Sequence, residues 1–113
     1  MRLVIDRTRT AVATAVAVAY TRHERRRGLL GRDFLDPAEG LVLAPCAAIH
    51  TAFMRFPIDV VFLDRNGRAL RVVHRLKPWR IAVSVKAHTV VELAAGALER
   101  HPVEVGDRLF LAC

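Results

Sequence analysis

Hydrophobic residues occur along this chain in short runs that are separated by polar and turn-forming residues. Runs of about four to eight β-prone residues bounded by Gly, Pro, Asn or Asp are typical of strands, and their shortness argues against both a disordered chain and a membrane span. Strands are expected at residues 2–6, 12–20, 41–43, 58–64, 68–76, 81–85, 89–93 and 108–112. This pattern predicts a mainly β fold, a β-sandwich or partly closed barrel of seven to eight strands with one short N-terminal helix.

The clearest local signal is a hairpin in the middle of the chain. The runs 58–64 and 68–76 are separated by Arg65-Asn66-Gly67, and Asn-Gly between strands indicates a tight turn because both residues tolerate positive φ. Alternation along the second run divides its side chains between two faces. One face carries Leu70, Val72, His74 and Leu76, and the other carries Arg71, Val73, Arg75 and Lys77. We therefore expect a basic stripe along the outer surface of the hairpin.

The helix is predicted where Thr21 precedes Glu24 by three positions. This spacing forms a capping box, in which each side chain accepts a hydrogen bond from a free backbone amide. Gly28 or Gly31 would end the helix after about two turns. Four arginines cannot all face a core, so a solvated face is expected for this cluster. The cluster consists of Arg22, Arg25, Arg26 and Arg27.

Residues 1–19 allow two interpretations. Three arginines precede an Ala/Val run that ends in Ala17-Val18-Ala19, which outlines a signal peptide. However, Asp6 interrupts the basic region, and valines alternate with alanines as they do in a half-buried strand. We therefore expect a strand in a cytoplasmic protein, with an exported protein as the alternative if residues 1–19 act as a signal.

Length and charge limit the classes of function. A chain of 113 residues has the usual size of one domain, so residues 1–113 are expected to form a single water-soluble domain. The formal charge of +7 arises from sixteen arginines and two lysines against eleven carboxylates. Nucleic-acid binders usually interleave basic residues with exposed aromatics, whereas the aromatics here sit in apolar runs such as Val61-Phe62-Leu63. Specific nucleic-acid binding is therefore not expected, and the charge favours at most a weak anion or nucleic-acid binder.

Cysteine and histidine residues give no sign of a metal or cofactor site. Cys46 and Cys113 are too few for a disulfide scaffold, and no C-x-x-C pair begins a zinc site. The spacing of His50, His74 and His88 matches none of the short ligand motifs. We expect neither a metal ion nor a cofactor.

One pair of residues suggests nucleophilic chemistry. Cys46 and His50 are four positions apart, which on an extended strand separates them by about 13 Å. If the chain turns after Pro45, the thiol and the imidazole would form a nucleophile and its base, with Asp59 or Glu92 orienting the ring. The alternative is a buried structural cysteine beside a hydrogen-bonded histidine, which is the commoner arrangement.

Asp59 and Glu92 are each embedded in an apolar run, where burial of a carboxylate is costly without a partner. In one interpretation each accepts hydrogen bonds from loop amides or an arginine and stabilises the fold. In the other, the two carboxylates line a shared polar pocket.

Three stretches of the chain together carry a family resemblance. They are Glu24–Leu30 (ERRRGLL), Ile49–Asp64 (IHTAFMRFPIDVVFLD), and Val91–Gly96 (VELAAG) with Val105-Gly106-Asp107. In this order they resemble the domain of unknown function 192, from about Tyr20 to the C-terminus. The resemblance implies a compact β-rich fold of sandwich or barrel type, found in bacteria and archaea, with no established activity. The commoner form of that family carries Trp-Met and then Lys-Asn-Thr near Phe53–Pro57, so roles suggested for that form need not transfer.

These observations favour a non-enzymatic domain that binds a small ligand or a protein partner. The ligand-binding candidates are Cys46, His50, Thr51, Met54, Asp59 and Glu92. A binding domain predicts a concave pocket near Met54, Asp59 and Glu92. The first alternative is a thiol-dependent hydrolase that uses Cys46 and His50, and the second is a weak anion or nucleic-acid binder that uses an arginine-rich face.

Overall fold

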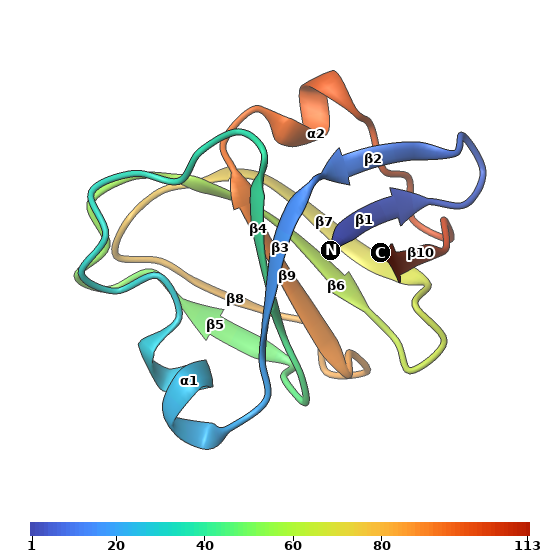
Figure 1. Cartoon of the computed structure of the whole chain (residues 1–113). Helices are drawn as coiled ribbons and strands as arrows, with labels where there is room; N and C mark the ends of the chain where they lie inside the picture. The colour runs from blue at the N-terminus through green and yellow to red at the C-terminus, as the bar shows by residue number, and fades with distance from the viewer.

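The computed structural model describes all 113 residues and contains ten strands and two helices (Figure 1). In chain order these are β1 (Arg2–Ile5), β2 (Thr10–Ala13), β3 (Ala15–Ala19), α1 (Arg22–Arg27), β4 (Glu39–Leu43), β5 (Ala48–His50), β6 (Ile58–Leu63), β7 (Ala69–Leu76), β8 (Ile81–Val83), β9 (Thr89–Ala94), α2 (Ala97–Arg100) and β10 (Leu109–Ala112). The mainly β class is as predicted. The expected seven to eight strands and the single N-terminal helix are corrected, because α1 follows three strands and α2 follows β9.

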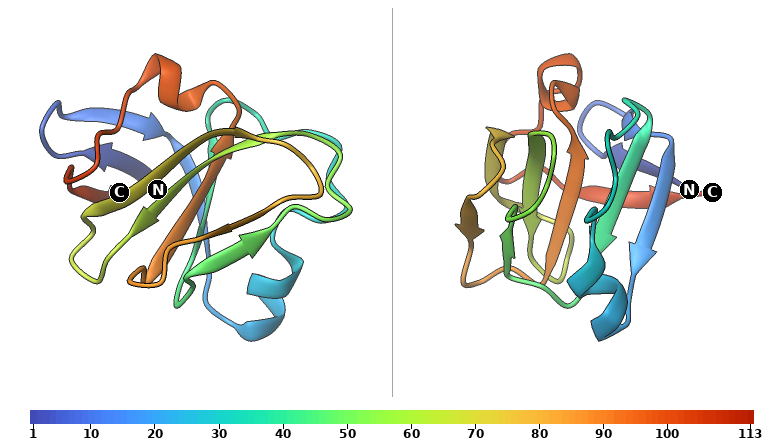
Figure 2. Two further views of the ribbon diagram at one scale, coloured as in Figure 1. Left: turned by 180° about the vertical axis from the view of Figure 1, so that it is seen from behind. Right: turned by 90° about the vertical axis from the view of Figure 1, so that its left-hand side faces the viewer.

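The strands form three sheets. A five-stranded sheet has the order β3-β4-β9-β6-β7, a three-stranded sheet has the order β10-β1-β2, and β5 pairs with β8. The five-stranded sheet is open, with β3 and β7 as its edges, so no closed barrel forms. Helices α1 and α2 lie at opposite ends of the molecule, and the two termini lie side by side (Figures 1 and 2).

The expected strand at residues 12–20 is divided at Thr14, which accounts for one of the additional strands. Before Thr14, β2 pairs antiparallel with β1; after it, β3 runs parallel to β4 in the larger sheet. The amides of Thr14 and Ala15 both donate to the Ala38 carbonyl, at 2.8 and 2.9 Å, where the chain passes between the sheets. Residues 1–19 thus contain three paired strands.

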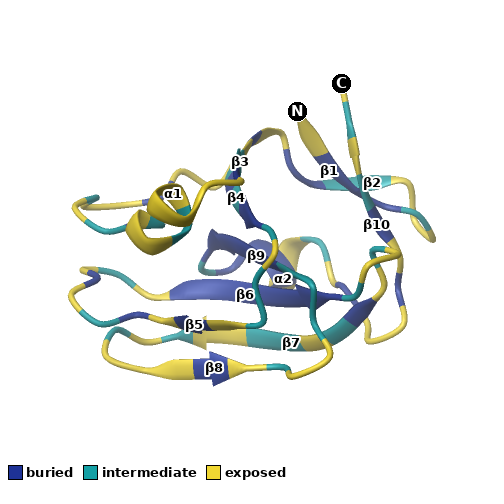
Figure 3. Cartoon of the chain, turned by 90° about the horizontal axis from the view of Figure 1, so that it is seen from below, coloured by how far each residue is buried: buried dark blue, intermediate teal, exposed yellow.

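The five-stranded sheet separates two hydrophobic clusters. Along β9, Val91 and Leu93 pack in a cluster with Leu3 of the three-stranded sheet. Val90 and Ala94 point the other way and pack in a cluster with Ile49 and Met54. The inner strand β6 is buried along its whole length, whereas much of β8 and its flanking loops are exposed (Figure 3).

The predicted hairpin is present as β6 and β7, but its turn is longer than a two-residue Asn-Gly turn. The carboxylate of Asp64 accepts hydrogen bonds from the amides of Asn66 and Arg68, at 2.8 and 3.0 Å. Only Gly67 of the Asn-Gly pair has a positive φ, of 82°. A Cβ atom on Gly67 would lie 2.5 Å from the Leu109 carbonyl oxygen, so this position requires glycine for space as well as conformation.

A bulge in β7 changes which of its side chains share a face. Ile58 pairs with Leu76 and Val60 pairs with Val73, so three steps along β7 oppose two along β6. Arg75 lies in this bulge at a φ of 49°. Leu76 therefore packs in the same cluster as Val73 and not with the Val72 face, which corrects the strict alternation expected from the sequence.

The same bulge interrupts the expected basic stripe. The Arg71 guanidinium donates to the Val83 carbonyl at 2.7 Å and lies 5.9 Å from the centre of the Phe62 ring. Arg75 instead turns toward α2 and forms an ion pair with Glu99 at 3.0 Å. The two arginines therefore serve different contacts and do not form one continuous surface.

Candidate functional site

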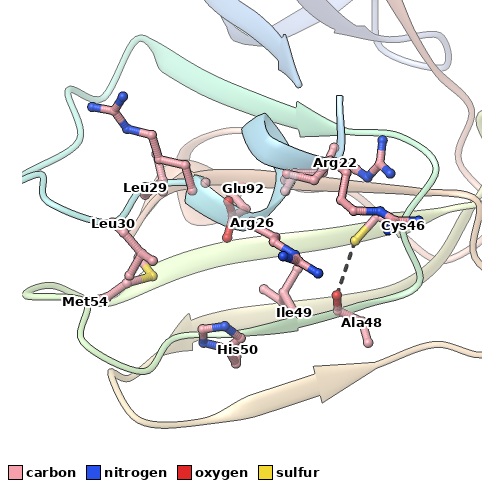
Figure 4. Close-up of a pocket in the computed structure, with 14 residues that line it drawn as sticks. Arg22, Arg26, Leu29, Leu30, Cys46, Ala48, Ile49, His50, Met54 and Glu92 are labelled. Carbon is pink, nitrogen blue, oxygen red and sulfur yellow. Dashed lines mark hydrogen bonds between the residues drawn. The ribbon is translucent and has the colours of Figure 1, made fainter. Parts of the chain in front are cut away.

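A cavity of about 260 Å³ lies between α1, β5 and the middle of β9 (Figure 4). Half of the residues that line it are apolar, and among these are Leu29, Leu30, Leu43, Ile49 and Met54. Its polar groups are the arginines of α1, the Cys46 thiol, the His50 imidazole and the Glu92 carboxyl. The cavity therefore combines a hydrophobic wall with one buried acid and several cations.

Local sequence signals account for the position of α1. Both hydrogen bonds of the predicted capping box are present, from the Glu24 amide to the Thr21 hydroxyl and from the Thr21 amide to the Glu24 carboxylate, each at 3.0 Å. These bonds hold the pKa of Glu24 below its ordinary value. The helix ends at Gly28, whose φ of 49° is a conformation that favours glycine.

The α1 arginines line the cavity on its cationic side. Arg25 is held by the carbonyl oxygens of Tyr20 and Ala44. Arg22, Arg26 and Arg27 are exposed and form no ion pair within the chain. The expected solvated face is thus also the border of the cavity, a role that charge clustering alone did not reveal.

Glu92 is the buried acid of the site. It lies on β9 between β4 and β6, where Leu41 and Val60 are its paired neighbours, and only 3% of its surface is exposed. Its Oε1 atom has no hydrogen-bond partner. Burial raises the pKa of Glu92 from 4.5 to about 7. A Cβ atom on Gly28 would lie 3.6 Å from this oxygen, so the glycine keeps the space above the carboxyl open.

The Cys46 thiol is a hydrogen-bond donor rather than an activated nucleophile. Its Sγ atom donates to the Ala48 carbonyl at 3.2 Å (Figure 4). Burial raises the pKa of this thiol above its ordinary value, which favours the protonated form. His50 lines the same cavity but forms no hydrogen bond with Cys46. The nucleophile and base arrangement considered from the sequence is therefore not formed.

Thr51, one of the six candidates, lies outside the cavity. It is fully buried, and its hydroxyl donates to the Lys77 carbonyl at 2.6 Å while accepting from the Arg80 amide at 2.9 Å. Its carbonyl oxygen accepts from the amides of Trp79 and Met54, at 3.0 and 3.2 Å. Thr51 thus joins two loops and has no free polar atom for a ligand.

Asp59 also lies outside the cavity, on the opposite face of the large sheet from Glu92. Its carboxylate accepts hydrogen bonds from the backbone amides of Arg75, Gly96 and Leu98, at 2.8, 3.1 and 3.0 Å. The pocket shared by Asp59 and Glu92 that the sequence suggested does not exist. Of the six candidates, Cys46, His50, Met54 and Glu92 are brought together.

The remaining histidine and cysteine residues do not form a second site. No group of three or more His, Cys, Asp or Glu side chains is arranged to hold a metal ion, so His50, His74 and His88 do not gather. Cys46 and Cys113 are both free thiols. Neither helix has the length and apolar character that a membrane crossing requires.

Two solved structures share this fold. A putative transcription regulator from Sinorhizobium meliloti 1021 superposes with a TM-score of 0.83 at 24% sequence identity, covering 96% of this chain and 89% of its own. A protein of unknown function from Novosphingobium aromaticivorans superposes with a TM-score of 0.77 at 21% identity, covering 85% of this chain and 74% of its own. At these identities the similarity concerns the fold alone.

Sequence relatives define the family. A UPF0127 protein of Pyrococcus horikoshii is 42% identical over 87 residues, which cover 71% of this chain and 75% of the relative. A UPF0127 protein of Pyrococcus furiosus is 45% identical over 64 residues, and that match spans about half (54%) of its length. A UPF0127 protein of Thermococcus sibiricus is 32% identical and covers 95% of this chain. The profile of DUF192, described as an "Uncharacterized ACR", matches residues 3–111, so this chain belongs to the DUF192 family.

Proposed function

We propose that this domain binds a small organic anion in the cavity beneath α1, and that the ligand brings a hydrogen-bond donor to Glu92. The observation that carries the proposal is the buried Oε1 atom of Glu92, which has no partner within the protein. Most buried polar atoms are hydrogen-bonded, and leaving one unsatisfied costs about 1–3 kcal/mol. A ligand that donates a hydrogen bond to Oε1 would offset this cost, so the free energy of binding would include it.

The border of the cavity supports an anionic group at the other end of the ligand. Arg22, Arg26 and Arg27 are cations without an acidic partner. Guanidinium groups match carboxylates and phosphates in geometry and charge, so these side chains are suited to hold such a group. Glu92 is kept more than 4 Å from every arginine nitrogen, which leaves the cations available.

The size and wall of the cavity restrict the ligand further. A volume of about 260 Å³ lies below the range of roughly 300–1,000 Å³ that is usual for drug-sized ligands. Apart from the arginines and Glu92, most residues of the wall are apolar. These features favour a short hydrocarbon chain with a carboxylate at one end and a hydroxyl or amino group at the other.

This binding function fits the geometry better than the two alternatives do. A thiol hydrolase needs a cysteine thiolate beside its base, whereas the Cys46 thiol donates to a carbonyl and its pKa is raised. A nucleic-acid surface needs contiguous cations, whereas Arg71 and Arg75 are engaged in separate contacts. The arginines of α1 remain the anion-binding candidates, at the scale of one small ligand.

Calorimetric titration with a matched series of compounds tests the proposal. The series is 5-hydroxypentanoate, pentanoate and 1,5-pentanediol, in which each of the last two lacks one polar end. We expect the hydroxy acid to bind best and each truncated compound to bind about tenfold more weakly, because one charge-assisted hydrogen bond is lost. Replacement of the hydroxyl by an amine tests whether Glu92 prefers a cationic donor.

Two variants and two controls locate the binding. Arg26→Ala should weaken the binding of the hydroxy acid and of pentanoate but not that of the diol. Glu92→Leu should weaken the binding of the hydroxy acid and of the diol but not that of pentanoate. Arg2→Ala and Glu104→Gln remove charges at exposed positions away from the cavity and should change nothing. The proposal would be overturned if neither Arg26→Ala nor Glu92→Leu changed the affinities. It would also be overturned if no compound of the series gave a heat of binding at millimolar concentration.

A further inference from the structure

A ridge of exposed apolar side chains lies along the outer side of β8. We call it the Trp79 ridge, and it consists of Phe53, Trp79, Ile81, Val83 and Val85. Side chains alternate along β8, so Ala82 is buried while Ile81 and Val83 point outward. Ile81 is 76% exposed. Val85, in the turn that follows the strand, is 86% exposed, and the ring of Phe53 lies 4.6 Å from that of Trp79. The ridge is thus an apolar surface with two aromatic rings at one end.

The fold holds these aromatic residues outward against local backbone preference. Phe53 and Trp79 both adopt a φ of 64°, which is rare for bulky residues. Their loops are joined by Thr51, whose carbonyl accepts from the Trp79 amide and whose hydroxyl bonds with the neighbouring backbone. A buried residue therefore stabilises the exposed position of the aromatic pair. Such preorganisation of an apolar surface is typical of an interaction site.

Exposed cations adjoin the ridge residues in the sequence. Lys77 and Arg80 lie on either side of Trp79 in sequence, and Lys86 follows Val85. All three are exposed and have no ion-pair partner. Aromatic and aliphatic side chains bordered by free lysine and arginine are the features that interfacial membrane-binding segments share.

We propose that the Trp79 ridge docks reversibly on the surface of an anionic phospholipid bilayer. The apolar side chains enter the boundary between headgroups and acyl chains, and Lys77, Arg80 and Lys86 contact the headgroup phosphates. Charge distinguishes this occupant from a second copy of the chain, because a two-fold contact through the ridge would bring like cations together. Only Phe53 and Trp79 could stack on nucleic-acid bases, whereas the other members of the ridge are aliphatic side chains, which are suited to enter lipid. This inference is independent of the cavity.

The protein contains one tryptophan, so Trp79 itself reports on the docking. Vesicles of phosphatidylcholine with 30% phosphatidylglycerol should shift its emission to shorter wavelength and protect it from acrylamide quenching. Vesicles of pure phosphatidylcholine should bind at least tenfold more weakly, because the three cations are attracted to an anionic surface. Added salt should weaken the binding for the same reason.

Matched variants test the ridge by vesicle sedimentation. Ile81→Glu and Val85→Glu alter exposed side chains, so the fold should persist, and each should reduce binding at least tenfold. Val105→Glu makes the same change at a residue that is 68% exposed outside the ridge and should bind as the unaltered protein does. Absence of binding to the anionic vesicles would overturn the proposal. So would a blue shift that grows with protein concentration in the absence of lipid, because that result indicates self-association through the ridge.

Discussion

Asp59 and Glu92 are both buried carboxylates on neighbouring strands of one sheet, yet their surroundings are opposite. Asp59 accepts three backbone hydrogen bonds, which join β7 and the start of α2 to β6. Glu92 has an oxygen without any partner and faces a cavity. On one face of the sheet, Asp59 stabilises the fold by joining separate elements through hydrogen bonds. On the opposite face, Glu92 is buried with an unpartnered oxygen, which lowers stability.

Removal of the Asp59 carboxylate should have the largest effect. Asp59→Ala leaves the amides of Arg75, Gly96 and Leu98 without their acceptor, so the free energy of unfolding should fall by about 4 kcal/mol. Urea denaturation monitored by circular dichroism at pH 7 measures the change. The exposed Asp33 is a control whose change to Ala should cost little, because its only ion pair is at the surface. Equal effects of the two substitutions would remove the structural role assigned to Asp59.

Removal of the Glu92 charge should have the opposite sign. The pKa of Glu92 is raised from 4.5 to about 7, so the folded state retains a proton that the unfolded state loses between these values. The penalty is absent below pH 4.5, grows as pH rises, and is complete above pH 7, where it is on the order of 3 kcal/mol. Glu92→Gln should therefore be more stable than the unaltered protein at pH 8 and similar at pH 4.

The difference between the two stability curves isolates Glu92. Hydrogen bonds from Arg32 and Arg7 lower the pKa values of Glu39 and Asp107, so these two carboxylates stabilise the fold less as pH falls. Because the unaltered protein and Glu92→Gln both contain them, their contribution cancels in the difference. Denaturant midpoints measured from pH 4 to pH 8 provide the comparison. A constant difference across this range would contradict the raised pKa.

A methyl group above Glu92 should have a smaller effect on stability. Gly28→Ala places a β-carbon at a φ of 49°, which costs about 1–2 kcal/mol, and sets that carbon 3.6 Å from Oε1. Gly31→Ala is the matched control, because Gly31 has a φ of 84° and no atom within 4 Å of the added carbon. Both variants should lose stability, but only Gly28→Ala should weaken binding of the hydroxy acid. Equal titration curves would show that the space above Glu92 is not used.

The smallest effect concerns the thiol beside the cavity. In a Cys113→Ser protein, Cys46 should react slowly with a thiol reagent at neutral pH, because burial raises its pKa. His50→Ala should leave the rate unchanged, since no hydrogen bond joins the two side chains. Rapid labelling that is lost in the His50→Ala protein would restore the hydrolase alternative.

Local features were predictable because they depend on neighbours in sequence. The capping box of α1 needs only Thr21 and Glu24, and the hairpin needs only two β-prone runs and a turn. The division of the strand at Thr14 was not predictable, since both halves keep β-prone composition and only pairing with different sheets separates them. The Arg75 bulge likewise depends on how β7 pairs with β6.

Which residues gather in the site depends on the register between neighbouring strands. The alternation of polar and apolar residues within one strand does not reveal that register. Asp59 pairs with Leu93 and Val60 pairs with Glu92, and directly paired residues share a face. A shift of one residue would have placed the two carboxylates together, as the shared-pocket interpretation required. The arginines of α1 were recognised as a cluster, but their place beside Glu92 follows from where the helix packs.

The pairing of β1 with β10 has a consequence for the order of folding. Arg2 pairs with Ala112, so the three-stranded sheet joins the two ends of the chain, whereas the five-stranded sheet uses strands from Ala15 to Ala94. A growing polypeptide thus has every strand of the larger sheet before β10 is synthesised. Closure of the long loop between β1 and β10 is entropically costly, and until β10 has been synthesised β1 can pair only with β2. Until then, the buried side chains of β1 are without the strand that covers one edge, and the nascent chain is exposed to mispairing there.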